Sequence, residues 1–424
     1  MVPVISLPPK SVSTRFHKIR SQSERLSAPL SAEDMVVQPV IDVSPPKWHL
    51  AHTTWFFEEF VLAPNASAYK RFHPKYAFLF NSYYEGAGER IQRVFRGNMT
   101  RPTSDELLDY RAYVNECMHE FLRKGDGVTS EALAMIELGL NHEQQHQELL
   151  IYDIKYILGH NPLFPEYRLD LPKQEQQPVD LTERWLEMEE GIYDIGHQGD
   201  GFHWDNETSR HRVFLESYRI QDRLITHGEF REFVEAGGYQ NYRPWLEEGW
   251  RWVNTNKIEA PFYWFKVEGE WMHVTLEGLK PIDWDLPMTH VNFYEADAFA
   301  RWKGKRLPTE FEWEAACQLY SPVIPETANF VEKELFGPKR REGQDLQFYG
   351  DVWEWTSSAY LPYPRYQIPE GTVGEYNGKF MVNQKVLRGG SCATPADHIR
   401  LTYRNFFHPH LQWLFNGFRL AEHR

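Results

Sequence analysis

Apolar and polar residues in the first 160 positions follow a helical pattern that is interrupted by short breaks. The breaks divide this region into four predicted helices, over residues 11–26, 44–63, 103–125 and 129–159. Two of the starts carry capping signals, because Ser44 precedes Pro45 at a first helical position and Ser104 precedes two acidic residues. Gly159 ends the last helix. The pattern predicts a four-helix bundle over residues 10–160.

The pattern changes after this region. Residues 161–185 are rich in proline and polar side chains, and they predict an extended linker. From residue 186 to residue 424, short alternating segments such as GIYDIG, HRVFLESYRI and KVLRGGS are separated by Gly, Asn and Asp turns. Only two clear helices stand among them, over residues 226–238 and 292–304. This half predicts a second domain of mixed α and β structure.

Composition and charge narrow the class of protein. The chain of 424 residues is 42% hydrophobic, and it has no apolar run of about 20 residues, so we expect a soluble globular protein with no membrane partner. The first residues lack a signal-peptide pattern, and the three cysteines, Cys117, Cys317 and Cys392, are few and widely spaced. A cytoplasmic location follows. The net charge of 46 − 60 = −14 disfavours nucleic-acid binding, and the sequence leaves the oligomeric state open.

Two histidines in the last predicted helix lie on one face. His142 and His146 are four residues apart, which is one helical turn. They share their face with Met135, Leu138, Leu149 and Asp153. Two imidazoles at this spacing can chelate one metal ion, and a helix inside a bundle gives them rigid support. The alternative is a pair of structural core histidines.

A third ligand is expected from the second helix. Of His49 and His52 we favour His52, because the stripe of Trp48, His52, Trp55 and Glu59 is the one expected to face the core. Three neutral imidazoles leave open positions on an octahedral ion for two substrate atoms and O₂. That arrangement suits iron(II) better than a closed structural zinc site.

The same residues contain a competing motif. His142-Glu143-Gln144-Gln145-His146 spells the H-E-x-x-H of zinc metalloproteases, in which Glu143 would be the general base. Glu166 stands twenty residues further on, but Gly159 and two prolines interrupt any helix before it. The extended form of the motif fails as well, because Leu149 and Tyr152 replace its glycine and third histidine. A protease is the weaker interpretation.

Two stretches give the sequence a specific resemblance. SPPKWHLAHTTWFFEEF with NHEQQHQE resembles the DinB-like four-helix domain of the ergothioneine-biosynthesis sulfoxide synthases, and the resemblance implies iron held by His52, His142 and His146. DNETSRHRVFLESYRI, MTHVNFYEADAFARWKGKRLPTEFEWEAA, GDVWEWTSSAY and KVLRGGSCATP resemble the formylglycine-generating-enzyme domain, which has a C-type-lectin-like fold. The implied reaction joins the sulfur of cysteine to the imidazole of trimethylhistidine, with Fe(II) and O₂.

Further site residues follow from this chemistry. Tyr83 and Tyr84 resemble the tyrosines of the cysteine-using branch, so we expect a phenol there to supply a proton. Arg93 and Arg96 are candidates to bind a substrate carboxylate, although either could be a surface ion-pair residue. Gln145 shares the histidine face, and the matching glutamine of the family implies a hydrogen bond to the histidine-derived substrate.

The second domain contributes a last expected group. The family places an asparagine and an aromatic residue beside the trimethylammonium group, which implies roles for Asn405, Phe406 and Phe407. The branch that uses γ-glutamylcysteine has Asp and Arg where this chain has Phe407 and Leu411, so free cysteine is the expected thiol donor. The alternatives are γ-glutamylcysteine as donor and, from a different class, a non-catalytic lectin-like binding protein that holds no metal.

Overall fold

The computed structural model describes residues 9–82, 88–173, 179–368 and 377–424. The chain folds into two compact units. The first unit comprises Met1–Pro162 with two later segments, Gly199–Asp205 and Gln367–Lys379. The second unit comprises Leu163–Gln198, Asn206–Tyr366 and Phe380–Arg424.

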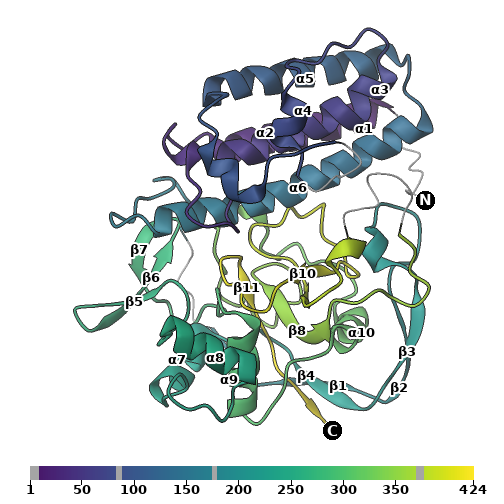
Figure 1. Cartoon of the computed structure of the whole chain (residues 1–424). Helices are drawn as coiled ribbons and strands as arrows, with labels where there is room; N and C mark the ends of the chain where they lie inside the picture. The colour runs from purple at the N-terminus through teal and green to yellow at the C-terminus, as the bar shows by residue number, and fades with distance from the viewer. Residues whose placement is uncertain (1–8, 83–87, 174–178, 369–376) are drawn as a thin grey trace. The chain divides into compact units, whose positions relative to one another are not determined.

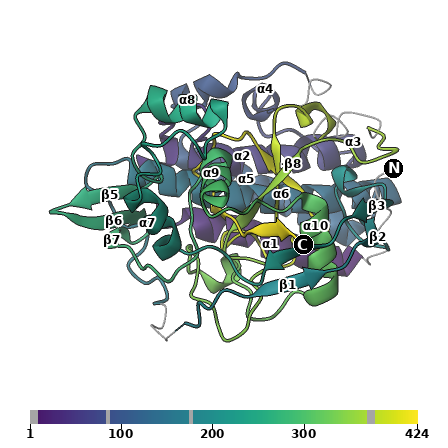
Figure 2. The same cartoon turned by 90° about the horizontal axis from the view of Figure 1, so that it is seen from below.

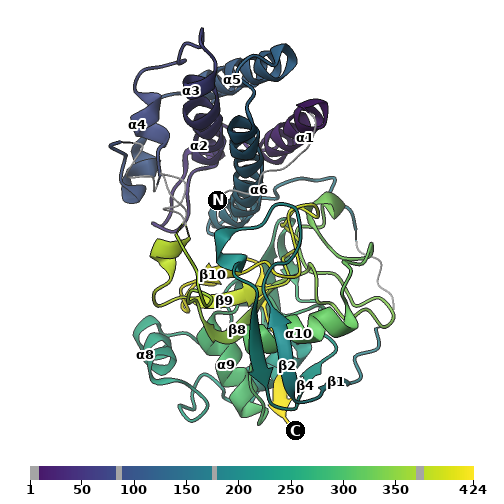
Figure 3. The same cartoon turned by 90° about the vertical axis from the view of Figure 1, so that its right-hand side faces the viewer.

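The first unit is a helical bundle, as the sequence pattern predicts. Its long helices are α1 (Pro9–Ser27), α2 (Pro46–Phe57), α5 (Ser104–Lys124) and α6 (Ser130–Gly159). Both α1 and α2 pack against α5 and α6, and Figure 3 shows the four helices together. Shorter elements of this unit are η1 (Asp34–Val36), η2 (Glu58–Leu62), α3 (Ala63–Asn65), α4 (Tyr76–Phe80) and η4 (Arg93–Asn98).

Two predicted helix starts are wrong by one residue. Pro45 is the residue before α2 and is extended (ψ 138°), because the ring of Pro46 keeps the preceding residue out of the helical conformation. The cap of α5 is Thr103, not Ser104, since Thr103 and Glu106 bond to each other's backbone N–H in a capping box. Local interactions at the helix N-terminus therefore decided where α2 and α5 begin.

Helix α2 is buried on every face. All twelve of its residues are buried, including Lys47 and His49, because α5, α6, α1 and α4 surround it. It continues into the π-helical turn η2, a distortion that is frequent at functional sites. A helix enclosed in this way belongs to the centre of a domain. Among the described helices, none is both long and apolar enough to cross a membrane.

In the part of the chain that the structure describes, the second unit contains four small sheets (Figure 1). Their strand orders are β1-β4-β12, β2-β3, β5-β6-β7 and β10-β9-β8-β11, and every pairing is antiparallel except the parallel pair β11 and β8. Figure 2 shows the β5-β6-β7 sheet apart from the others. The strands are β1 (Trp185–Met188), β2 (Gly191–Ile195), β3 (His211–Leu215), β4 (Tyr218–Gln221), β5 (Trp264–Val267), β6 (Glu270–Thr275), β7 (Gly278–Pro281), β8 (Trp353–Ala359), β9 (Lys385–Arg388), β10 (Asn405–Phe407), β11 (Asn416–Gly417) and β12 (Ala421–His423).

Helices of the second unit include the two that the sequence made clear. They are α7 (His227–Glu235) and α9 (Phe293–Trp302), and the unit also holds α8 (Glu247–Asn256), α10 (Glu310–Tyr320) and η6 (Val331–Lys333). The short turns η5 (Asp205–Glu207) and η8 (Gly378–Phe380) each span a point where the chain passes from the first unit to the second. The expectation of only two clear helices is wrong, because α8 and α10 are also present. In α8, Gly249 disfavours helix in the sequence but packs tightly against Tyr294. The close approach of α8 to Tyr294 thus requires glycine at position 249, a residue with low helix propensity.

Candidate metal centre

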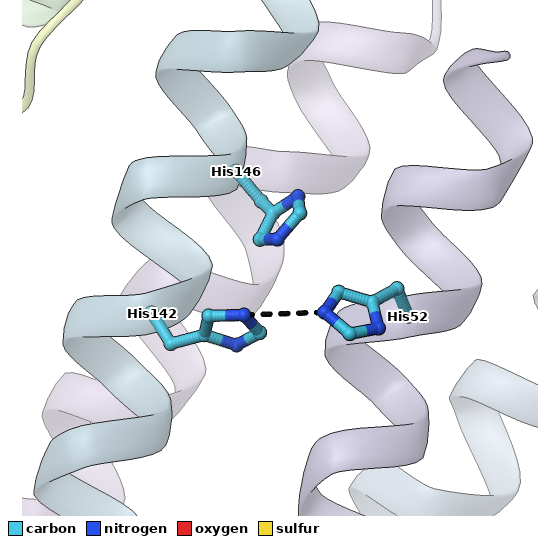
Figure 4. A group of neighbouring side chains, drawn as sticks. All are labelled: His52, His142 and His146. Atoms are coloured by element: carbon cyan, nitrogen blue, oxygen red, sulfur yellow. Dashed lines mark hydrogen bonds between the residues drawn. The ribbon is translucent and has the colours of Figure 1, made fainter. Parts of the chain in front are cut away.

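Three histidines converge inside the first unit. His52 projects from α2, and His142 and His146 project from successive turns of α6. Each offers a ring nitrogen, and these atoms lie within 4.8 Å of one another (Figure 4). The structure therefore brings together the three residues that the sequence analysis selected, and it selects His52 rather than His49.

The closest pair sets the scale of the site. Nε2 of His52 lies 3.2 Å from Nε2 of His142. Two nitrogens that bind one ion with bonds of about 2.0–2.1 Å cannot lie more than about 4.2 Å apart. The 3.2 Å spacing of the His52 and His142 nitrogens therefore fits a shared metal ion.

The three imidazoles are held in the neutral form that a metal requires. Burial is the main cause: it lowers the pKa of His142 to about 4 and lowers the pKa values of His52 and His146 well below the ordinary range. The neighbouring histidines, as like charges, lower the pKa values of His52 and His146 further. A neutral ring keeps a lone pair available for coordination.

The backbone orients His52. Its Nδ1 lies 2.6 Å from the carbonyl oxygen of Phe80, which can only accept a hydrogen bond, so Nδ1 carries the proton and Nε2 presents its lone pair. The His52 ring is also stacked between Trp48 and Trp55, with centroid distances of 4.6 Å and 5.4 Å. These contacts fix the ring plane and line the site with apolar surface.

His49 lies next to the three-histidine cluster, between His146 and Asp153. Its Nδ1 lies 2.9 Å from Nδ1 of His146, and its Nε2 lies 2.9 Å from Oδ2 of Asp153. Both ring nitrogens are engaged, so His49 supports a ligand and is not one itself. Sequence reasoning missed this pairing, although Asp153 already lay on the histidine face of α6, seven residues after His146.

Glu143 is not placed to act as a general base. Its carboxylate accepts hydrogen bonds from Arg20 (2.9 Å), Arg111 (2.6 Å) and Ser23 (2.6 Å), and all four side chains are buried. Burial by itself raises the pKa of Glu143, but the two guanidinium groups and the hydrogen bonds outweigh it and lower that pKa to about 2. The glutamate of the H-E-x-x-H motif therefore has a structural role, which counts against the protease interpretation.

The structure distinguishes the two candidate arginines. Arg96 is buried, donates to the hydroxyls of Ser44 (3.0 Å) and Ser82 (2.8 Å), and lies with its guanidinium carbon 3.4 Å from the centroid of Trp48. Its charge lowers the pKa values of His52 and His146, so it is a cation beside the three histidines. Arg93 is half-buried and donates to the carbonyl oxygen of Asp42 (2.6 Å).

The remaining expected site residues are Gln145 on α6, the two tyrosines, and three residues of the second unit. Gln145 is half-buried on α6, one turn from His142. Tyr83 and Tyr84 lie outside the described residues. In the second unit, Asn405, Phe406 and Phe407 form strand β10 and are half-buried.

Strand geometry limits what β10 can present to one ligand. Successive side chains of a strand point to opposite faces, so Asn405 and Phe407 share one face and Phe406 lies on the other. The ring of Phe406 is stacked on Tyr360 with a centroid distance of 4.1 Å, and the ring of Phe407 meets Trp413 edge to face at 5.6 Å. Phe406 and Phe407 therefore cannot both face the same bound group.

Comparison with known families matches both halves of the chain. Residues 15–150 match the DinB superfamily, and residues 171–325 and 343–424 match the sulfatase-modifying factor enzyme 1-like domain. The second match covers more than half of the sequence. The order of the two domains is the one that the sequence motifs predict.

Curated relatives include two hercynine oxygenases and an ergothioneine-biosynthesis protein, beside formylglycine-generating enzymes. A hercynine oxygenase of Mycolicibacterium smegmatis is 32% identical over 67% of this chain and 70% of that protein. A hercynine oxygenase of Mycobacterium tuberculosis is 33% identical over 51% of this chain and 55% of that protein. Ergothioneine biosynthesis protein 1 of Schizosaccharomyces pombe is 26% identical over 52% of this chain, but only 28% of that protein is covered.

The two domain matches, their order and the first of these relatives agree with one another. The bundle supplies a cluster of three histidines, of which His52 and His142 are buried and His146 is half-buried. The second unit supplies the mixed sheet-and-helix fold of the larger family match. The chain belongs to the ergothioneine-biosynthesis sulfoxide synthases, which join a DinB-like domain to a sulfatase-modifying-factor-like domain.

Proposed function

We propose that this protein is a non-haem iron(II) enzyme that uses O₂ to form a carbon–sulfur bond between cysteine and the imidazole of trimethylhistidine, giving a sulfoxide. The observation that supports the proposal most strongly is the convergence of His52, His142 and His146 inside the helical bundle. The similarity to hercynine oxygenases supports trimethylhistidine as the acceptor, since hercynine is trimethylhistidine.

The donor set favours iron over a structural metal. Three neutral imidazoles occupy one side of an ion and leave the remaining positions for substrates, whereas a structural zinc site closes with four protein ligands. Within the described residues, the cluster that could hold a metal contains no cysteine or carboxylate. Iron(II) held by these three histidines would activate O₂, and it would bind the thiolate sulfur and an imidazole nitrogen so that the sulfur lies next to the ring carbon that it joins.

The surrounding residues bind and orient the substrates. Arg96 supplies a guanidinium beside the histidines, and Arg forms charge-assisted pairs with a carboxylate such as that of an amino acid. Gln145, on the turn between the α6 histidines, offers an amide to the ring of the histidine-derived substrate. Trp48 and Trp55 exclude water from the side of His52, which keeps the reaction away from bulk solvent.

Free cysteine is the proposed thiol donor. Phe407 and Leu411 stand where the γ-glutamylcysteine-using branch of the family has an acidic and a basic residue. Without those two charges, the γ-glutamyl amino and carboxylate groups have no partners at these positions. γ-Glutamylcysteine remains the second candidate.

An anaerobic reconstitution tests this function directly. The full chain is loaded with iron(II) and mixed with trimethylhistidine and either cysteine or γ-glutamylcysteine, O₂ is then admitted, and the products are identified by mass spectrometry. We expect stoichiometric iron and a trimethylhistidine–cysteine sulfoxide from cysteine. Faster coupling with γ-glutamylcysteine would reverse the assignment of the donor. A folded protein that binds no metal would instead favour the lectin-like alternative.

A further inference from the structure

A chain of hydrogen bonds leads from the ligand His146 to a buried carboxylate. His49 lies between them, with Nδ1 2.9 Å from Nδ1 of His146 and Nε2 2.9 Å from Oδ2 of Asp153. The backbone N–H of Ser44 donates to the same Oδ2 at 2.8 Å. His49 and Asp153 are each 3% exposed or less, so water does not compete for the bonds to the Asp153 carboxylate.

The carboxylate fixes the positions of the protons along this chain. Oδ2 of Asp153 already accepts from the backbone N–H of Ser44, and as a carboxylate oxygen it also accepts from the nitrogen of His49 that faces it, so Nε2 carries the proton. Nδ1 of His49 is then the acceptor for Nδ1–H of His146. The remaining nitrogen of His146, Nε2, is left with a lone pair for the metal.

We infer that His49 and Asp153 are positioning residues that set the tautomer and the ring orientation of His146 for metal binding. This inference rests on the proposed metal centre. It assigns to His49 a role distinct from that of a ligand, because neither of its nitrogens is left to coordinate. Metal-binding histidines commonly donate their second N–H to a carboxylate or a carbonyl, and here a second histidine carries that interaction to Asp153.

The Ser44 contact separates this role from simple core packing. Because the backbone of Ser44 donates to Oδ2, the carboxylate is anchored where the loop enters α2 and does not depend on His49 for its position. His49 is therefore held by a fixed acceptor on one side and acts on His146 on the other. His52 has an independent support, the carbonyl oxygen of Phe80.

Two substitutions of His49 separate hydrogen bonding from shape. The amide of His49→Gln can accept from His146 with its oxygen and donate to Asp153 with its nitrogen. His49→Phe keeps an aromatic ring in the same space but removes both hydrogen bonds. An exposed histidine of the same unit provides the control, His73→Ala.

The measurement is metal binding by the full chain, not turnover. Cobalt(II) is titrated into each metal-free protein, with its visible absorption reporting the ligand arrangement and thermal unfolding reporting the fold. We expect His49→Phe to weaken cobalt binding by about 10- to 100-fold with an altered spectrum. His49→Gln should retain most of the affinity and the native spectrum, and His73→Ala should match the native protein.

Each outcome decides between the inference and an alternative. Native affinity and an unchanged spectrum in His49→Phe would overturn the positioning role, and so would equal losses in the Phe and Gln variants, since shape alone would then explain them. If His49→Phe does not fold, His49→Asn, which is too short to reach both partners, takes its place in the same comparison. Failure of the native protein to bind cobalt would refute the metal centre itself, which is a different result.

Discussion

Nε2 of His52 and Nε2 of His142 lie 3.2 Å apart, although 90 residues separate them in the chain. Their approach results from the packing of α2 against α6 in the interior of the bundle. Neither helix forms the site alone, because α6 carries two of the histidines and α2 carries the third. The candidate metal centre is therefore a property of the folded bundle.

Removal of one ligand should abolish metal binding. His142→Ala leaves two imidazoles, and we expect it to lose stoichiometric iron(II) and all carbon–sulfur coupling, as measured by anaerobic titration and mass spectrometry of the products. His160, exposed and just beyond the end of α6, gives the matched control His160→Ala, which should keep both. Native activity in His142→Ala would end the three-histidine interpretation.

Arg96 should contribute more to substrate binding than Arg93. We expect Arg96→Lys to raise KM for one of the two amino-acid substrates by about 10- to 100-fold, because a charge-assisted hydrogen bond contributes roughly 1.5–3 kcal/mol. The effect should be much smaller for Arg93→Lys, since Arg93 is half-buried and bonded to the Asp42 carbonyl oxygen. Steady-state kinetics with each substrate varied in turn measures both, and equal effects would remove Arg96 from the site.

The tyrosines at positions 83 and 84 should control the fate of the thiol. A phenol with a pKa near 10 keeps its proton at pH 7 and can deliver it to a strongly basic oxygen. Replacing both with Phe preserves the rings, and we expect the products to shift from the sulfoxide toward oxidised thiol. An unchanged rate and product ratio, measured by mass spectrometry, would return both residues to a packing role.

Glu143 should stabilise the fold at neutral pH and lose this effect in acid. Its pKa falls from 4.5 to about 2 on folding, so its contribution is complete above pH 4.5 and is lost as the pH falls toward 2. That shift corresponds to about 3 kcal/mol of unfolding free energy. Glu143→Gln should cost about 3–5 kcal/mol at pH 7, because Arg20 and Arg111 keep buried charges without their partner.

Urea unfolding at pH 7 and pH 3 measures the Glu143 effect. The difference between native protein and Glu143→Gln should shrink as the pH falls from 4.5 toward 2, since the carboxylate of the unfolded chain takes up a proton in this range while the native carboxylate stays ionised. Glu120 on α5 is exposed and pairs with Lys124, so Glu120→Gln is a control that should change little at either pH. A pH-independent difference would show that the ion pairs do not supply this stability.

Much of the bundle could be predicted because its signals are local. The helical pattern located α1, α2, α5 and α6 to within a few residues, and the spacing of His142 and His146 placed them on one face. The motifs of the second half predicted its fold class as well. The details that failed, the starts of α2 and α5 and the existence of α8, depend on proline sterics, a capping box and close packing.

The choice among the histidines of α2 depended on tertiary structure. A one-sided stripe was expected to separate His52 from His49, yet every residue of α2 is buried, so burial does not distinguish them. Only the positions of α6 and Phe80 show that His52 faces His142 while His49 bridges His146 and Asp153.

The sequence by itself determined the helices, the order of the two domains and the pair of histidines one turn apart, because these follow from contacts between near neighbours and from family-specific motifs. The tertiary structure decided which third histidine joins that pair, that His49 lies between His146 and Asp153, and that Glu143 belongs to an ion-pair network with Arg20 and Arg111. The physical reason is that a tautomer, a lone pair or a buried charge is set by the atom opposite it. In this protein that atom lies on another helix, up to 123 residues away.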